Sequence, residues 1–366
     1  MINTTLIWLL ALPVILGIVL FILKGKNQDS CVPIAAYVGV AVLVVCAGFF
    51  ISKGAKTWDT EIWNGQVTSK DRAEGSYVRS YDCMCVSHTD SKGNTTTTCQ
   101  TCYEDHYTVK WTCNSTVGSY TIKALDETSR RVYMTPDPHR YRIIEKGDPA
   151  AAPHRYTNYV QAVPESLFTP AAKDLKLKFK GLLPKYPDSV YDFYKIDRFI
   201  TPGYAVNDAA QWNQDISLAL RERGPKKQVN AIIVVAKTDD PNYEYALRDA
   251  WEGANKNDVV LLIGSANFPK IDFVRVLSWT KNEDFKVELR DAVMDKGTID
   301  RSIVPLMMAQ IDKNFERRHM KEFEYLEGEI DPPMWLNLTL IALVFIGAIG
   351  MYIFLDQNTS SFRRFR

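Results

Sequence analysis

The sequence lacks a marked excess of charge of either sign. Its 44 Lys and Arg residues are offset by 43 Asp and Glu residues, and no basic block is long enough to indicate nucleic-acid binding. It also lacks the signatures of several enzyme classes: there is no Walker loop, no His-Glu-x-x-His and no Ser-His-Asp order. These absences argue against a nucleic-acid partner. They leave open whether the chain is an enzyme and favour a non-enzymatic role.

Three long stretches contain no Asp, Glu, Lys, Arg or His, at residues 6–23, 32–51 and 334–355. A helix needs roughly 20 apolar residues to cross the hydrocarbon core of a bilayer, so the sequence predicts three transmembrane helices. The first is not typical of a signal peptide, because residues 1–5 contain no basic side chain. A transporter or channel is disfavoured, since no charged residue would line a path through the membrane.

The basic residues beside these stretches predict an orientation. Lys24 and Lys26 lie between the first two spans, and the tail, residues 356–366, ends in Phe-Arg-Arg-Phe-Arg. With three spans these two segments share one side of the membrane, and their positive charge places that side in the cytoplasm. We therefore expect a protein of the inner or plasma membrane whose residues 52–333 lie outside the cytoplasm.

The outer region divides by pattern into two parts and a connection. Residues 52–168 contain segments of alternating apolar and polar side chains, such as 107–113, which are typical of half-buried strands. The Thr run at residues 95–98 is expected at a hairpin tip. A Pro- and Lys-rich connector, residues 169–206, follows. This part predicts a β-rich module that contains most of the cysteines.

Residues 207–326 have a different pattern. Nearly continuous β-branched runs, typical of strands that are buried on both faces, alternate with helical spacing. The predicted order is helix, strand, helix, strand, strand, helix, helix, with the last helix at residues 300–326. We expect an α/β sandwich, so that the outer region as a whole is α+β.

This second part resembles the TPM domain, a small α/β domain named for plant thylakoid, photosystem-repair and receptor-modulating members. The likeness rests on the strand at residues 231–236, on Tyr245 and Trp251 in the next helix, and on the segment 256–263 with its polar turn. Phosphatase activity and calcium binding are attributed to some members, and Asp258 is the residue that matches the family's loop Asp. The whole chain also resembles membrane proteins of tailed phages and bacteria that have no assigned activity.

Five of the seven cysteines are clustered in the β-rich module, as Cys83-x-Cys85, Cys99-x-x-Cys102 and Cys113. The first four could bind zinc tetrahedrally at the ends of a hairpin, which would leave Cys113 over. In an oxidising compartment they would form disulfides instead, across the hairpin, for example between Cys85 and Cys99. The predicted topology favours disulfides, and zinc remains the alternative.

Three carboxylates are candidate ligands for a cation such as calcium. Asp239 and Asp240 follow the first buried strand of the α/β domain, where ligands of such sheets tend to bind, and Asp258 precedes the second. The competing interpretation is that Asp239 and Asp240 cap the helix that begins near Pro241.

Together these features predict a membrane-tethered, non-enzymatic binding, scaffold or assembly protein. Small residues in the spans, including Gly17, Gly39 and Gly48, would allow close helix packing in a homo-oligomer or against another membrane protein. The alternative is a metal-dependent phosphohydrolase of the TPM type, acting outside the membrane.

Overall fold

The computed structural model describes residues 3–24, 28–163 and 173–363. These form two compact units, each described by itself. The membrane unit contains the described residues of 3–60, 155–163 and 318–363, and the soluble unit contains 61–154 and 173–317.

The membrane unit contains three helices long and apolar enough to cross a membrane, as predicted. They are α1 (Thr4–Lys24), α2 (Gln28–Thr57) and α11 (Met334–Arg363), and each extends beyond the predicted run. The short helix α4 (Tyr159–Ala162) and the 3-10 helix η2 (Met320–Glu329) complete the unit. The final residues of the basic tail, 364–366, lie outside the described residues.

The three long helices pack around a seam of side chains that includes Val45 and Leu340. Two glycines permit this approach: a Cβ atom at Gly48 would lie 2.8 Å from Leu340 Cδ2, and one at Gly17 would overlap Val38. A Cβ atom at Gly39 would meet nothing within 4 Å. Gly17 and Gly48 therefore serve packing inside the chain, whereas Gly39 faces outward.

Polar contacts mark the two ends of the bundle. Asp331, just before α11, accepts a hydrogen bond of 3.0 Å from Asn3 Nδ2 at its carboxylate and one of 2.6 Å from Lys56 Nζ at its backbone oxygen. Lys24 pairs with Asp356 at the other end. The amino end of α1 thus lies beside the points where the chain leaves α2 and enters α11. In a three-span topology these points share one side of the membrane.

Three tryptophans project from that same end of the bundle. Trp8, Trp58 and Trp335 are 76%, 67% and 67% exposed. Indole rings favour the level of the lipid headgroups, because one edge is polar and the rest apolar. Their position matches the membrane–water interface on the side of the soluble region.

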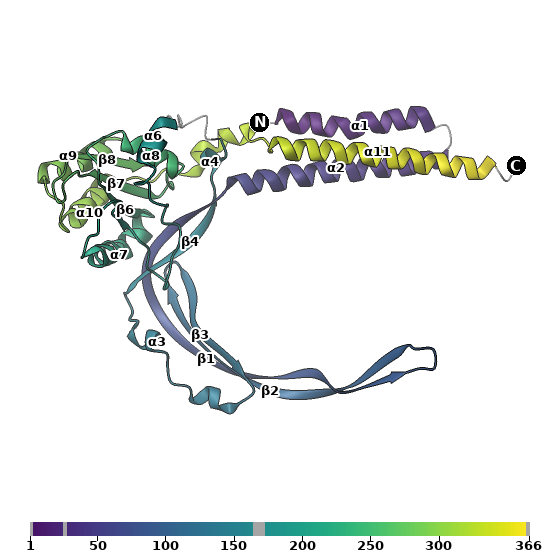
Figure 1. Cartoon of the computed structure of the whole chain (residues 1–366), viewed down its shortest axis with the longest axis horizontal. Coiled ribbons are helices and arrows are strands. Elements are labelled where there is room, and N and C mark those ends of the chain that lie inside the picture. The colour runs from purple at the N-terminus through teal and green to yellow at the C-terminus, as the bar shows by residue number, and fades with distance from the viewer. Residues whose placement is uncertain (1–2, 25–27, 164–172, 364–366) are drawn as a thin grey trace. The chain divides into compact units, whose positions relative to one another are not determined.

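The soluble unit contains an α/β sandwich with three layers (Figure 1). Its sheet has the order β5-β6-β7-β8, in which β5, β6 and β7 are parallel and β8 is antiparallel to β7. The strands are β5 (Phe199–Ile200), β6 (Asn230–Ala236), β7 (Asp258–Gly264) and β8 (Phe273–Ser278). The helices are α6 (Lys173–Phe179), α7 (Ala209–Lys227), α8 (Tyr243–Ala250), α9 (Asp284–Lys296) and α10 (Ile303–Asn314).

Alternation along the strands builds two cores. Every residue of β6 and β7 is buried, as the β-branched runs predict. Side chains such as Ile233 and Leu261 pack on one face against α7, α9 and α10, and Val234 and Leu262 pack on the other against α8 and α6. The element order from α7 to α10 is the order predicted from the sequence.

Two predicted boundaries of this domain are wrong. The helix predicted at residues 300–326 ends at Asn314, and a separate 3-10 helix begins at Met320. Between them the chain is extended, and Arg317 forms an isolated bridge with Thr280. The predicted connector, of which residues 169–172 lie outside the described residues, contributes α6 and the edge strand β5 to the domain. β5 is only 2 residues long, too short to be read from a pattern.

The β-rich module forms a second sheet with the order β3-β2-β1-β4. Its strands are β1 (Trp58–Thr89), β2 (Thr95–Ser115), β3 (Gly118–Glu127) and β4 (Pro149–Thr157), and the short helices η1 (Arg130–Met134) and α3 (His139–Ile143) follow β3. β1 and β2 pair antiparallel from Val67 to Thr89, and Figure 1 shows them as long paired ribbons. β3 pairs with β2 only as far as Tyr107. Beyond this point no other strand of the described residues pairs with β1 and β2, and we name residues 77–106 the arm.

Candidate functional site

The arm exposes side chains on both of its faces. Its residues are exposed almost without interruption, in contrast to the buried start of β1. Six large hydrophobic side chains of the arm are among the exposed ones: Tyr77, Val78, Tyr81, Met84, Val86 and Tyr103. Each of these side chains is available to contact a partner.

A β-bulge sets the register of the arm. Cys83 pairs with Gln100 and Val86 with Thr98, so that Met84 and Cys85 together face the single residue Cys99. Met84 adopts a left-handed conformation with φ of 47°, which non-glycine residues rarely do. Because of the bulge, two cysteines that are two residues apart on β1 can both pair with cysteines that are three residues apart on β2.

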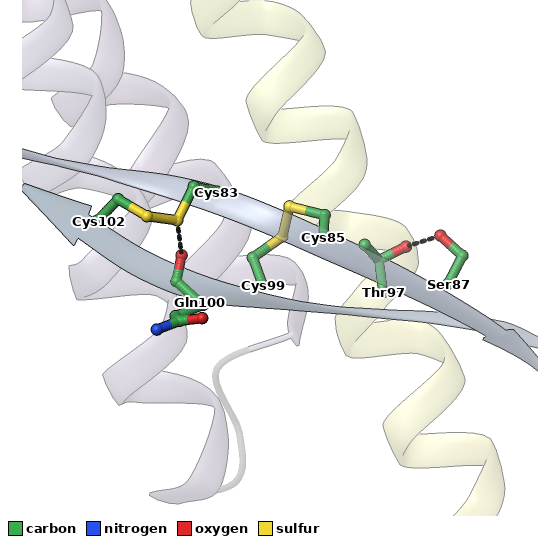
Figure 2. Close-up of a disulfide and its surroundings, with 7 residues drawn as sticks. All are labelled: Cys83, Cys85, Ser87, Thr97, Cys99, Gln100 and Cys102. Atoms are coloured by element: carbon green, nitrogen blue, oxygen red, sulfur yellow. Dashed lines mark hydrogen bonds between the residues drawn. A yellow bond between two sulfur atoms is a disulfide. The ribbon is translucent and has the colours of Figure 1, made fainter.

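Two disulfides connect the strands of the arm, Cys83–Cys102 and Cys85–Cys99 (Figure 2). The second is the pair expected from the sequence. Because Cys99 and Cys102 are three residues apart on a regular strand, they lie on opposite faces, and so do the two disulfides. The four sulfur atoms are bonded in two pairs, so zinc binding by all four residues requires both disulfides to be reduced first.

The disulfides explain how the arm can remain folded. A two-stranded hairpin is marginally stable in water without a third strand or a packed face. The cross-links close loops with sequence separations of 19 and 14 residues, which restricts the unfolded ensemble of the arm. Farther out, the hydroxyls of Ser87 and Thr97 lie 3.0 Å apart across the strands.

A compact turn closes the arm at residues 90–94. Asp90 Oδ1 accepts hydrogen bonds from the backbone N–H groups of Lys92 (2.9 Å) and Asn94 (2.8 Å). These bonds favour the carboxylate, and they lower the pKa of Asp90. Gly93, with φ of 83°, supplies the left-handed residue of the turn. The run Thr95–Thr98, predicted at the tip, instead lies in β2 and pairs with β1. The turn forms earlier in the chain than predicted, because the Asp90 carboxylate accepts hydrogen bonds from the backbone of residues 92 and 94.

A packed three-stranded base holds the inner end of the arm. Val109 and Trp111 are fully buried against Val132 of η1. Trp111 Nε1 donates a 2.7 Å hydrogen bond to Asp137 Oδ1, which satisfies the buried indole. Cys113 is buried nearby as a free thiol, and its burial raises its pKa. The thiol is therefore held protonated, as suits a small core residue.

One polar cluster lies where the arm leaves the base. His106 Nδ1 is 2.8 Å from Asp126 Oδ1, and Tyr77 Oη donates to Asp126 Oδ2 at 2.8 Å. The rings of Tyr77 and His106 stack with centroids 5.2 Å apart. The hydrogen bonds from His106 and Tyr77 lower the pKa of Asp126. These contacts hold the end of β3 against the arm.

The structure does not bring the three candidate cation ligands together. Asp258 is the first residue of β7 and pairs with Asn230, the first residue of β6, whereas Asp239 and Asp240 follow the far end of β6. The two groups thus lie at opposite ends of these neighbouring strands. Asp240 accepts hydrogen bonds from Asn242 N–H and pairs with Lys178. The described residues contain no group of three His, Cys, Asp or Glu side chains placed to hold a metal.

Asp258 belongs instead to a buried hydrogen-bond network. Its carboxylate accepts from Tyr186 Oη (2.6 Å), Asn230 Nδ2 (2.9 Å) and the backbone N–H of Asn255 (2.9 Å). Burial raises the pKa of Asp258 to about 6, because desolvation outweighs these bonds. The Asn230 side chain also accepts from Arg198 Nε at 3.2 Å. One amide thus bridges a buried carboxyl and a buried guanidinium.

Arg198 ties the two sheets of the soluble unit together. It donates to Ser217 Oγ on α7 (2.8 Å) and to Asn64 Oδ1 on β1 (2.5 Å). Burial lowers the pKa of Arg198 to about 10. Asn64 Nδ2 in turn donates to the backbone oxygen of Val229 at 3.0 Å. The start of β1 is therefore anchored to the α/β sandwich, and no local pattern in the sequence indicates either partner.

A buried ion pair also anchors this strand. Arg317 Nη2 donates to both carboxylate oxygens of Glu61, at 2.6 and 2.7 Å. Trp63 Nε1 donates to Glu61 Oε1 at 2.8 Å, and His154 stacks on the Trp63 ring with centroids 3.6 Å apart. Glu61 is fully buried. The base of the arm is thus held by hydrogen bonds and charge as well as by packing.

The soluble unit also has an open cavity of about 580 Å³ beside the amino half of α7. Tyr191, Tyr194 and Lys195 line one side, and Asn213 and Gln214 line the other. The Asn213 side-chain oxygen is already bonded to the backbone N–H of Arg198 at 2.6 Å. The cavity contains none of the residues singled out from the sequence.

Comparison with known proteins does not place the chain in a family. No family model, no curated protein and no solved structure matches it.

Proposed function

We propose that this chain is a membrane-tethered binding or assembly protein and that the arm is its binding element. The observation that carries the proposal is the arm itself. It is fixed by two disulfides and anchored at its base, yet its large apolar side chains are exposed. A rigid element loses little conformational entropy on binding, which favours affinity.

The disulfides also support the proposed side of the membrane. Disulfides form and persist in oxidising compartments outside the cytoplasm. Placing the soluble region there leaves Lys24, Lys26 and the basic tail on the cytoplasmic side, in agreement with the positive-inside rule. The proposal is therefore a protein of the inner or plasma membrane with an extracytoplasmic arm.

Accessibility on intact cells tests the orientation. An epitope inserted before Gly93, in the turn of the arm, is expected to bind antibody without permeabilisation. An epitope at the C-terminus is expected to need permeabilisation. The reverse pattern would contradict the proposed side.

Cross-linking in native membranes tests the binding role. Replacing Val78, Met84 and Tyr103 by Ser removes three side chains that are 61%, 79% and 72% exposed. We expect the cross-linked species that contain the chain to disappear or shift. The matched control replaces Tyr245, Val287 and Met294, exposed residues of α8 and α9, by Ser. Equal cross-linking in both variants would contradict the proposal that the arm is the binding element.

The alternative proposal, a metal-dependent phosphohydrolase, rests on the resemblance to the TPM domain and on Asp258. That side chain is fully buried and its oxygens are engaged by three donors. A catalytic role would require it to become accessible. Unchanged phosphatase activity in an Asp258→Ala protein would remove its central residue.

A further inference from the structure

One edge of the arm is open along its length. β3 ends at Glu127, which pairs with Tyr107, and among the residues that the structure describes no strand continues beside β2 from His106 to Thr95. A strand at a sheet edge presents unpaired N–H and C=O groups that can pair with another chain. The arm therefore offers a backbone template as well as apolar side chains.

This edge also lacks the features that normally protect an edge strand. Proteins block such edges with Lys, Pro, inward charges or bulges. Residues 95–103 contain no charged residue and no proline, and five of them are threonines, which favour strands. The opposite strand carries Arg79, Asp82 and the bulge at Met84. One edge of the arm is thus guarded and the other is not.

Charge is unevenly distributed at the inner end of the open edge. Glu104 and Asp105 lie on β2, and Asp126 and Glu127 end β3. The guanidiniums nearby belong to Arg79, opposite Glu104, and to Arg130. The imidazole of His106 also lies 3.5 Å from Glu104 and 2.8 Å from Asp126. Four carboxylates against two guanidiniums and one imidazole leave this end negative. A strand that continues alongside β2 would meet this charge with one of its own ends.

We propose that the open edge of β2 accepts an extended segment of a partner protein as an additional strand, with Lys or Arg at the end that meets Glu104 and Asp105. The inference rests on the proposed function of the arm and specifies its partner. Main-chain hydrogen bonds supply affinity in such strand addition, and side chains supply specificity. A second copy of β2 is a poorer fit. In an antiparallel pairing its turn, with Asp90 and Lys92, would meet the acidic end without any net positive charge.

The test uses the full chain, purified in mild detergent without reductant. The probe is a labelled peptide of alternating Val and Thr with a Lys pair at one end, and binding is followed by fluorescence anisotropy. Control peptides have a Glu pair in place of Lys, or N-methylated backbone nitrogens. We expect the Lys peptide to bind about tenfold more tightly than the Glu peptide, a difference of about 1.4 kcal/mol. The N-methylated peptide is expected not to bind, since it cannot pair with the edge.

Charge reversal locates the site. The double variant Glu104→Lys, Asp105→Lys is expected to prefer the Glu peptide. The control Asp82→Lys, on the guarded strand, is expected to keep the preference for Lys. An unchanged preference in the double variant, or equal binding of all three peptides, overturns the proposal.

Two further outcomes also overturn it. One is self-association of the chain through the arm that the Lys peptide cannot displace, which would assign the edge to a second copy. The other is absence of binding by every peptide. Either result leaves the binding role of the arm to be judged separately, by the loss of cross-linked species in the Val78, Met84 and Tyr103 variant.

Discussion

Cys85 lies across from Cys99, whereas an uninterrupted register would place Thr98 there. The extra residue of the bulge, Met84, makes the difference. The consequence is that each cysteine of one strand meets a cysteine of the other, on opposite faces of the arm. A cross-link on each face restrains both twisting and splaying of a hairpin that has no core of its own.

The pairing predicts the outcome of peptide mapping without reductant. We expect linked peptides that contain Cys83 with Cys102 and Cys85 with Cys99, and an unmodified thiol at Cys113. Metal analysis of the same sample is expected to find no zinc bound by the four paired cysteines. About one zinc per chain, with these four thiols titratable after denaturation, would support the zinc alternative and place the region in a reducing compartment.

Removing the disulfides is expected to loosen the arm and leave its base intact. For loops of about 15 residues the chain-entropy model gives about 3 kcal/mol per disulfide, or roughly 100-fold in local opening. Hydrogen exchange of the amides between residues 86 and 98 should accelerate by that order in a Cys85→Ser, Cys99→Ser variant. The amides of Val109 and Trp111 should remain protected, since the base has its own core.

A matched control for that experiment is Cys31→Ser, which removes an exposed thiol outside the arm. It is expected to leave exchange in the arm unchanged. Protected arm amides in the disulfide variant would mean that an unrecognised contact, and not the cross-link, holds the strands.

Glycine substitutions in the membrane unit should separate internal from external packing. Gly17→Leu is expected to destabilise the bundle by about 1–3 kcal/mol, because its side chain must displace Val38. Gly39→Leu is expected to leave the fold of the single chain intact, since a Cβ atom there meets nothing. Thermal unfolding in detergent measures both. A proposed homo-oligomer that uses the Gly39 face would be weakened by Gly39→Leu alone, as cross-linking would show.

The buried pair of Glu61 and Arg317 is expected to matter far more than a pair on the surface. Glu61→Gln leaves Arg317 buried without its counter-charge, which typically costs 3–5 kcal/mol. The control is Asp188→Asn, whose partner Lys185 is 85% exposed. That change should cost less than about 0.5 kcal/mol. Urea unfolding of the soluble region gives both values, and equal costs would contradict the anchoring role of Arg317.

The same pair shows which parts of the fold could be predicted from the sequence. The three spans, the buried strands β6 and β7 and the pair Cys85–Cys99 follow from local patterns of hydrophobicity and spacing. The end of the helix at Asn314 does not follow from such a pattern. The extended segment after it contains Arg317, which pairs with Glu61, 256 residues away in sequence. No local pattern encodes such a partner.

The three candidate cation ligands are not brought together, for a related reason. Asp239 and Asp258 each stand next to a buried strand, but one follows its strand and the other begins its strand. In a parallel pair, a residue that follows one strand and a residue that begins its neighbour are separated by the length of a strand. The length of the arm could not be predicted either. Its strands are exposed on both faces, so they lack the alternation that marks a half-buried strand.

Asp258 is expected to make stability depend on pH. Burial raises its pKa in the folded chain to about 6, above the ordinary value of 3.8, so the folded chain binds its proton more tightly than the unfolded chain. The resulting stabilisation is fully present below about pH 4 and is lost as the pH rises through about 6. The loss attributable to this group is on the order of 3 kcal/mol. Urea unfolding followed by tryptophan fluorescence between pH 4 and 7 would measure it.

The matched variant is Asp258→Asn, which has nearly the same shape but no charge to desolvate. Its amide nitrogen would face donors such as the backbone N–H of Asn255, so we expect a loss of about 1–3 kcal/mol near pH 4. The dependence on pH between 4 and 6 should flatten, because the group that takes up the proton is gone. If the slope persists in the variant, another group is responsible for it, and folding does not raise the pKa of Asp258.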